Sequence, residues 1–174
     1  TYPRITHPGV TIVPVEEDYG PITKFFGALN SEEAPDTLVV VVDDDIIYDP
    51  TVREACEKNY AKHPHCVVSG AGIVYKYSNL ELPWFLCMTG RREKYLSLLP
   101  SFLGSSVTTT VCGYASISFR RSLIHREKLL DFIGFHNKDK GCFFNDDIVI
   151  SAFLSTQGVP RLCKEMPLCT HHPE

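Results

Sequence analysis

The sequence predicts an α/β domain with a mostly parallel central sheet and helices on both faces. Residues 38–42 form an apolar, β-branched run without alternation, which is typical of a strand buried on both faces. Segments of strand character alternate along the chain with segments of helical periodicity. The 174 residues, 44% of them hydrophobic, suffice for the core of one compact domain. We therefore expect a single domain over residues 1–174.

The expected strands are short β-rich runs that end at glycine, proline or charged residues. Pro8-Gly9 precedes the first run, and three aspartates end the apolar run described above. Gly113 interrupts the longest run, after which strand character resumes. In chain order, the expected strands are residues 10–15, 38–42, 66–69, 108–119 and 161–163.

The expected helices are identified by apolar spacing and by their ends. Pro21 suits a first helical turn, and the apolar residues that follow recur at helical spacing: Phe25, Phe26 and Leu29. Further helices are expected over residues 50–60 and 120–132. Asn145 is a good N-cap for a last helix, which Gly158 ends. Residues 75–106 hold prolines and aromatics without a period, so we expect a loop-rich excursion that shapes a pocket or lid.

Composition narrows the possible functions. The net charge is −4, and no stripe of Lys and Arg is present, so we expect no nucleic-acid partner. No run is long and apolar enough for a transmembrane segment. The seven cysteines are odd in number and include no C-x-x-C pair. They indicate reduced, mostly buried thiols, and hence a cytoplasmic protein.

Three consecutive aspartates, Asp43, Asp44 and Asp45, follow the apolar run 38–42. Ligands of open α/β sheets bind beyond the carboxyl ends of the strands. In an extended chain Asp43 and Asp45 point to the same side, where a divalent cation would keep both ionised. Carboxylate ligands favour Mg²⁺ or Mn²⁺, either of which can bridge the phosphates of a nucleoside diphosphate. The alternative is a solvated acidic turn, but nothing structural requires this concentration of charge.

Three motifs occur in a fixed order: DYGPITK at residues 18–24, VDDDIIY at 42–48 and NDDIVIS at 145–151. This trio resembles the GT-A-fold (Rossmann-like) glycosyltransferases of the family 2-like group, which are nucleotide-diphospho-sugar transferases, and more distantly the fringe-type transferases. The resemblance covers roughly residues 10–160. It implies metal-dependent transfer of a sugar from a nucleoside-diphosphate sugar, with a UDP-sugar expected, to a hydroxyl of a glycan or other acceptor, with inversion.

The resemblance implies donor and metal residues. Asp43 and Asp44 would bind the donor on its ribose or base side, and Asp45 would ligate Mn²⁺ or Mg²⁺. Lys24 either reaches the diphosphate or is a solvated helix lysine. A further metal ligand is expected from one of two histidines near the C-terminal end of the sequence, His171 and His172.

The resemblance also implies catalytic and acceptor residues. Asp147, with Asp146 beside it, matches the acidic pair that supplies the catalytic base. Gly113 and Tyr114 match a glycine-containing turn beside the acceptor site, so we expect them to contact substrate. Acids in a first helical turn also complement the helix dipole, and that alone could explain the pair.

The sequence departs from the GT-A pattern at its start. Only about 40 residues precede the aspartate motif. In that pattern a first strand is followed by a glycine- or arginine-containing loop that binds the nucleotide base. The first strand and helix are therefore expected to be short or missing here.

Two other functions compete with sugar transfer. One is a HAD-type phosphatase with Asp43 as nucleophile. Its motif has Thr or Val where Ile47 stands, and its late acidic pair ends a strand instead of starting a helix. The other is a non-catalytic nucleotide-sugar-binding domain, which would keep the aspartate motif and lack a base.

Overall fold

A five-stranded mixed sheet forms the centre of the computed structural model, which describes residues 7–73, 106–107, 110–136, 145–167 and 169–171. The strands lie in the order β1 (Leu38–Val41), β7 (Ile117–Arg120), β3 (Val67–Ser69), β8 (Arg161–Cys163) and β5 (Ser106–Val107). Only β3 and β8 are parallel, and the other three neighbouring pairs are antiparallel. The α/β class is confirmed, but the prediction of a mostly parallel sheet is wrong. A strand buried on both faces has the same apolar pattern in either direction, so the pattern does not reveal its orientation.

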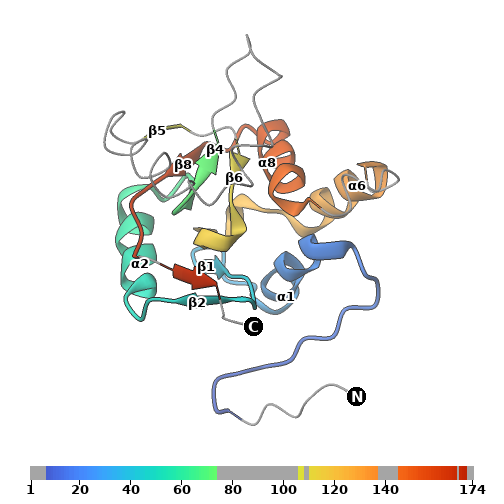
Figure 1. Ribbon diagram of the computed structural model, residues 1–174. Helices are drawn as coiled ribbons and strands as arrows, with labels where there is room; N and C mark the ends of the chain where they lie inside the picture. Colours follow the sequence, from blue (N-terminus) through green and yellow to red (C-terminus); the bar gives the residue numbers. More distant parts are fainter. Residues whose placement is uncertain (1–6, 74–105, 108–109, 137–144, 168, 172–174) are drawn as a thin grey trace.

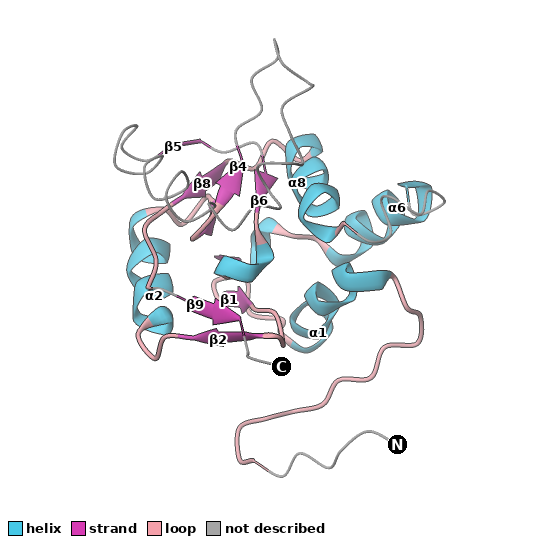
Figure 2. Ribbon diagram, in the orientation of Figure 1, coloured by secondary structure: helices cyan, strands magenta, loops and turns pink. Residues whose placement is uncertain are grey.

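Helices cover both faces of this sheet, as predicted. Helix α2 (Val52–Lys62) packs on one side, and α1 (Thr23–Ser31), α6 (Arg126–His136) and α8 (Asp146–Thr156) lie on the other (Figures 1 and 2). Among the described residues, none of the helices combines the length and apolar character that a bilayer crossing requires.

Strand β7 separates the two layers by the alternation of its side chains. Ile117 and Phe119 belong to the apolar cluster on the side of α1, α6 and α8. Ser116 and Ser118 alternate with them, and Ser116 Oγ lies 4.0 Å from the Sγ of Cys56 in α2. A period of two along the strand therefore directs apolar residues to the larger core and small polar residues to α2.

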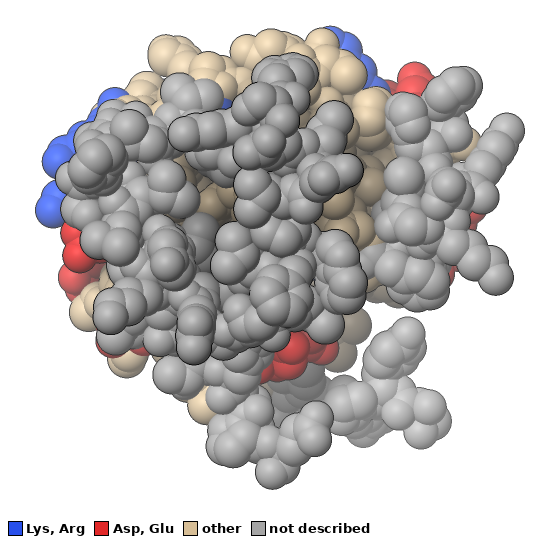
Figure 3. Space-filling model, turned by 45° about the horizontal axis from the view of Figure 1, so that its top comes forward, with Lys and Arg blue, Asp and Glu red and all other residues tan. Residues whose placement is uncertain are grey.

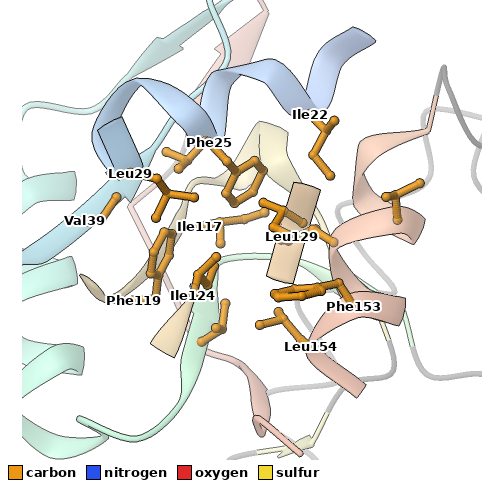
Figure 4. Close-up of a cluster of buried hydrophobic side chains, with 14 of the residues drawn as sticks. Ile22, Phe25, Leu29, Val39, Ile117, Phe119, Ile124, Leu129, Phe153 and Leu154 are labelled. Carbon is orange, nitrogen blue, oxygen red and sulfur yellow. The ribbon is translucent and has the colours of Figure 1, made fainter. Parts of the chain in front are cut away.

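The larger core joins three helices to the sheet. Phe25 and Leu29 of α1 meet Phe119 of β7, Leu129 of α6 and Phe153 of α8 (Figure 4), and all five side chains are buried. Burying one such side chain contributes roughly 1.5–3 kcal/mol. This packing fixes the starts of α1 and α8 relative to the end of β1.

Two small antiparallel sheets complete the described fold. Strand β2 (Ile46–Tyr48) pairs with β9 (Cys169–His171), with Ile46 opposite His171. Strand β4 (Gly72–Ile73) pairs with β6 (Thr110–Val111). The sequence did not predict β2, β4 or β9, because two or three residues are too few to show a period.

Several predicted elements are confirmed. Strands β1, β3 and β8 and helices α2 and α8 lie within one or two residues of their expected bounds, and α1 contains the three apolar residues that predicted it. Asn145 caps α8, and its side chain accepts a hydrogen bond from the N–H of Ile148 at 3.2 Å. Gly158 follows the helix with a positive φ of 66°, a conformation that glycine adopts readily.

Residues 10–15 do not form the predicted strand. They belong to an arm that leaves the body of the fold, in which Val10 and Ile12 are 48% and 52% exposed (Figure 1). A β-rich sequence becomes a strand only where a neighbouring strand and a buried face stabilise it. Among the described residues this arm has no strand partner.

The expected helix at residues 120–132 begins later. A 3₁₀ turn, η3 (Arg121–Leu123), comes first, and α6 starts at Arg126. The Arg121 guanidinium donates to the carbonyl oxygens of Glu32, Leu29 and Ile124 at 2.9–3.0 Å, which stabilises the irregular turn.

The expected strand at 108–119 is divided by a second 3₁₀ turn, η2 (Gly113–Ala115), which separates β6 from β7. Residues 108–109 lie outside the described residues, as do residues 75–105 of the expected loop. The last residue of that expected loop, Ser106, is the first residue of strand β5.

Candidate functional site

Four segments meet at the carboxyl end of β1: the residues after β1, the start of α1, the turn η2 and the start of α8. Lys24 of α1 forms an ion pair with Asp43, and its Nζ lies 2.8 Å from Asp146 Oδ2 in α8. The Gly113 N–H donates to Asp147 Oδ1 at 2.7 Å. We refer to Lys24, Asp43, Gly113, Asp146 and Asp147 as the strand-end cluster.

Gly113 lies at the centre of the strand-end cluster. A Cβ at this position would be 3.0 Å from Lys24 Nζ, 3.3 Å from Asp147 Oδ1 and 3.4 Å from Asp43 Oδ2. The α-carbon of Gly113 therefore faces three charged groups from three different elements. The absence of a side chain lets those groups approach one another.

Asp147 has the electrostatic character of a base. Burial raises the pKa of its carboxyl from 3.8 to about 6, and the negative charges of Asp146 and Asp43 add to this increase. The Gly113 N–H and the Lys24 ammonium oppose it. At neutral pH the carboxylate is largely ionised, yet it holds a proton more readily than an ordinary aspartate.

Lys24 supplies positive charge to the cluster. Burial alone lowers the pKa of its ammonium, but the contacts with Asp146 and Asp43 outweigh burial, so the pKa is raised above its ordinary value. The side chains of Lys24, Asp43 and Asp146 are 23%, 24% and 15% exposed. Lys24 is therefore not a freely solvated helix lysine, and its contact with a diphosphate stays a prediction.

The raised pKa of Asp147 predicts a pH-dependent stability. Its carboxyl holds a proton more tightly in the folded protein than in the unfolded chain. This contribution to stability is therefore fully present below pH 3.8 and is lost as the pH rises through about 6. We expect Asp147→Asn to gain stability relative to the wild type over this interval, with about 3 kcal/mol as the upper limit. Urea denaturation of both proteins from pH 4 to pH 8 measures the difference, and a constant difference would contradict the prediction.

Asp44 and Asp45 lie apart from the ion pairs of the strand-end cluster. Both are exposed, and they occupy a turn between β1 and β2. The extended conformation ends before them, so the expectation that Asp43 and Asp45 share one side by strand alternation does not hold. On the face seen in Figure 3, acidic side chains reach the surface in several small groups. Acidic surface alone therefore does not single out a site, whereas the convergence on Gly113 does.

The donor chemistry of this turn fits a hard divalent cation. No group of three or more candidate ligand side chains gathers within the described residues. However, Mg²⁺ is commonly bound by one or two carboxylates together with substrate phosphates and water. Asp45 can supply such a carboxylate, and phosphate oxygens and water would complete the coordination.

The two histidines predicted near the metal differ in what the structure says of them. Strand pairing sets His171 opposite Ile46, the residue after Asp45. The backbones of Asp45 and His171, both predicted metal ligands, therefore lie close together. The side chain of His171 and the whole of His172 lie outside the described residues.

Tyr48 and Ser151 have roles that the motifs did not reveal. The Tyr48 hydroxyl accepts the N–H of Asp43 at 2.9 Å and so supports the aspartate turn. Ser151 Oγ accepts the N–H of Val111 at 3.0 Å, one helical turn after Asp147. Tyr114, predicted to contact substrate, is half-buried in η2 beside Gly113. The contact of Ser151 joins segments distant in the sequence, and that of Tyr48 depends on a turn, so residue type alone does not indicate them.

Comparison with known proteins adds no family to this description. No protein-family model matches the sequence, and no curated protein matches it at a significant level.

Proposed function

We propose that the protein is a metal-dependent inverting glycosyltransferase that moves a sugar from a nucleoside-diphosphate sugar, with a UDP-sugar expected, to an acceptor hydroxyl. One observation carries the proposal. Asp147, a half-buried carboxylate with a pKa of about 6, lies beside Lys24 and Asp43 at the carboxyl end of β1, the first strand of the five-stranded sheet. In open α/β sheets, ligands bind beyond the carboxyl ends of the strands.

Asp147 is suited to act as a general base in this reaction. The Gly113 N–H holds Oδ1, and Oδ2 receives no hydrogen bond from the described residues. Oδ2 would take the proton of the acceptor hydroxyl as its oxygen forms a bond to the anomeric carbon. The bond from that carbon to the diphosphate breaks, and the leaving group keeps the electron pair. A base with a pKa close to the working pH suits this proton transfer.

Lys24 and the aspartate turn are suited to binding the donor. The Lys24 ammonium is a fixed positive charge at the strand end, where it can attract a diphosphate. Asp43 and Asp44 would contact the nucleoside, and Asp45 would hold the cation. A bound Mg²⁺ or Mn²⁺ would supply stabilisation of negative charge on the leaving diphosphate.

Donor binding should depend on a divalent cation. We expect affinity for UDP, measured by calorimetry, to fall at least about tenfold in excess chelator, which corresponds to about 1.4 kcal/mol. Asp45→Asn should bind UDP equally weakly with and without Mn²⁺, because it removes the charge of the ligand but little volume.

Asp44→Asn is the matched control, since it removes one charge from the same exposed turn. It should retain the response to Mn²⁺. Full affinity of the wild type in chelator would contradict metal dependence, and equal effects of the two substitutions would assign the effect to general charge.

The phosphatase alternative gains no support from the acidic pair. Asp146 and Asp147 lie in the first turn of α8 and not at a strand end. Release of phosphate from a phosphomonoester, against release of UDP from a UDP-sugar, distinguishes the two activities. UDP binding without turnover would favour the non-catalytic alternative.

A cytoplasmic location of the protein is proposed as well. Cys56, Cys66 and Cys163 are free thiols in the part of the chain that the structure describes. Unpaired cysteines are in keeping with the reducing, cytoplasmic environment expected from the sequence.

A further inference from the structure

Helix α8 binds the main chain next to the site through two side chains one turn apart. Asp147 Oδ1 accepts the Gly113 N–H at 2.7 Å, and Ser151 Oγ accepts the Val111 N–H at 3.0 Å. Residues four apart on a helix share a face. Successive N–H groups of an extended chain point in opposite directions, so those of residues 111 and 113 point the same way. Two side chains of α8 therefore accept the N–H groups of residues 111 and 113, as carbonyl groups of a neighbouring strand would.

The intervening residue confirms this geometry. The Cys112 N–H points away from α8 and donates to the carbonyl oxygen of Ala71 at 3.1 Å. The Cys112 carbonyl accepts the Ser69 hydroxyl at 2.9 Å. Hydrogen bonds thus hold residues 111–113 from both sides, and α8 provides one of the two sides.

Ser151 is the buried member of this pair of contacts. It is 3% exposed and Val111 is fully buried, whereas Asp147 is half-buried. The Ser151 carbonyl also accepts a hydrogen bond from Arg161 Nη1 at 2.8 Å. Loss of the hydroxyl would leave the Val111 N–H without an acceptor in a dry environment, and the helix would shift or the N–H would remain unsatisfied.

We propose that Ser151 is a positioning residue that sets the register of α8 against residues 111–113, and thereby holds Asp147 on the Gly113 N–H with Oδ2 turned to the acceptor. The inference rests on the proposed function for the role of Asp147 as base. In this role Ser151 fixes the position of α8, and the Gly113 N–H anchors Oδ1 of Asp147 so that Oδ2 faces the acceptor.

The test reads the Gly113 amide by NMR in the free protein. In Ser151→Ala the amide proton should move upfield as its hydrogen bond lengthens, and its hydrogen exchange should accelerate at least about tenfold. Exchange at Ile117 in the sheet should change far less. Ser155→Ala is the matched control, because Ser155 lies one turn further along α8 and its hydroxyl donates only within the helix, to the Ser151 carbonyl.

A pair of variants of equal volume keeps the test decisive if Ser151→Ala folds poorly. Ser151→Thr retains the hydroxyl and Ser151→Val does not, so any strain from the added methyl group is common to both. In Ser151→Thr the Gly113 amide shift and exchange rate should stay close to those of the wild type. In Ser151→Val both should change as they do in Ser151→Ala. An unchanged Gly113 amide in Ser151→Ala, or equal signals in the threonine and valine variants, would overturn the proposal.

A transfer assay separates this inference from the proposed function. In Ser151→Ala, turnover with a UDP-sugar should fall at least about tenfold while affinity for UDP is unchanged, because misaimed catalytic groups cost rate and not ground-state binding. A wild-type protein without any transfer activity would refute the proposed function. In that case a changed Gly113 amide in Ser151→Ala would still support the register role of Ser151.

Discussion

Replacing Asp147 by asparagine should lower turnover at least a hundredfold and leave the fold intact. General-base catalysis contributes about 10²–10⁴-fold, and asparagine cannot take the acceptor proton. The amide oxygen of asparagine can still accept the Gly113 N–H that Asp147 Oδ1 accepts at 2.7 Å. Affinity for UDP should change little, because the base acts only as the acceptor proton leaves. Initial rates and calorimetric binding of UDP check both parts.

Asp146→Asn is the internal control for this prediction. Asp146 shares the first turn of α8 but contacts Lys24 instead of Gly113. Its substitution should reduce stability more than rate. If both variants lose only stability, the acidic pair is a helix-start feature. If Asp146→Asn alone abolishes turnover, the base is Asp146 and the assignment is off by one residue.

Replacing Lys24 by methionine should destabilise the fold by about 2–3 kcal/mol. Removing one partner of a buried ion pair typically costs about 3–5 kcal/mol, and the partial exposure of this cluster reduces that figure. Without the ammonium, the carboxylates of Asp43 and Asp147 next to Gly113, and that of Asp146 beside them, lose their compensating positive charge. The loss should be larger at pH 8 than at pH 5, because Asp147, with a pKa of about 6, adds its charge between these values.

Urea denaturation of Lys24→Met at pH 5 and pH 8 measures this effect. Lys58→Met is the control, since Lys58 is exposed on α2 and its loss removes the same charge far from the strand end. Equal stability of the two variants at both pH values would mean that Lys24 is a surface lysine whose contacts contribute nothing measurable.

The sequence predicts the strongly patterned elements and names several of the residues that the structure brings together. The run that forms β1 and the capped helix that begins after Asn145 follow from apolar spacing and local hydrogen bonding. Asp43, Asp147 and Gly113 are far apart along the chain, and the structure brings them together as their motifs implied.

Features that depend on distant partners could not be predicted. Strand direction is one, because β7 carries the same buried pattern in either orientation. The arm that contains Val10 and Ile12 has strand composition but no strand partner among the described residues. The hydrogen bond from Val111 to Ser151 is another, since a serine within a helix gives no sign of which N–H it will accept.

Strand β1 has a consequence for how the protein behaves in concentrated solution. It is the edge of the five-stranded sheet, with β7 as its single partner strand among the described residues. Edge strands of natural proteins are usually protected by lysine, proline or a bulge, but this one reads Leu-Val-Val-Val and continues into Val42, which is 46% exposed. No strand of the described residues pairs with its outer N–H and C=O groups, on which a strand of another molecule can therefore add. Aggregation is therefore expected to begin at the same strand that carries Asp43 to the site.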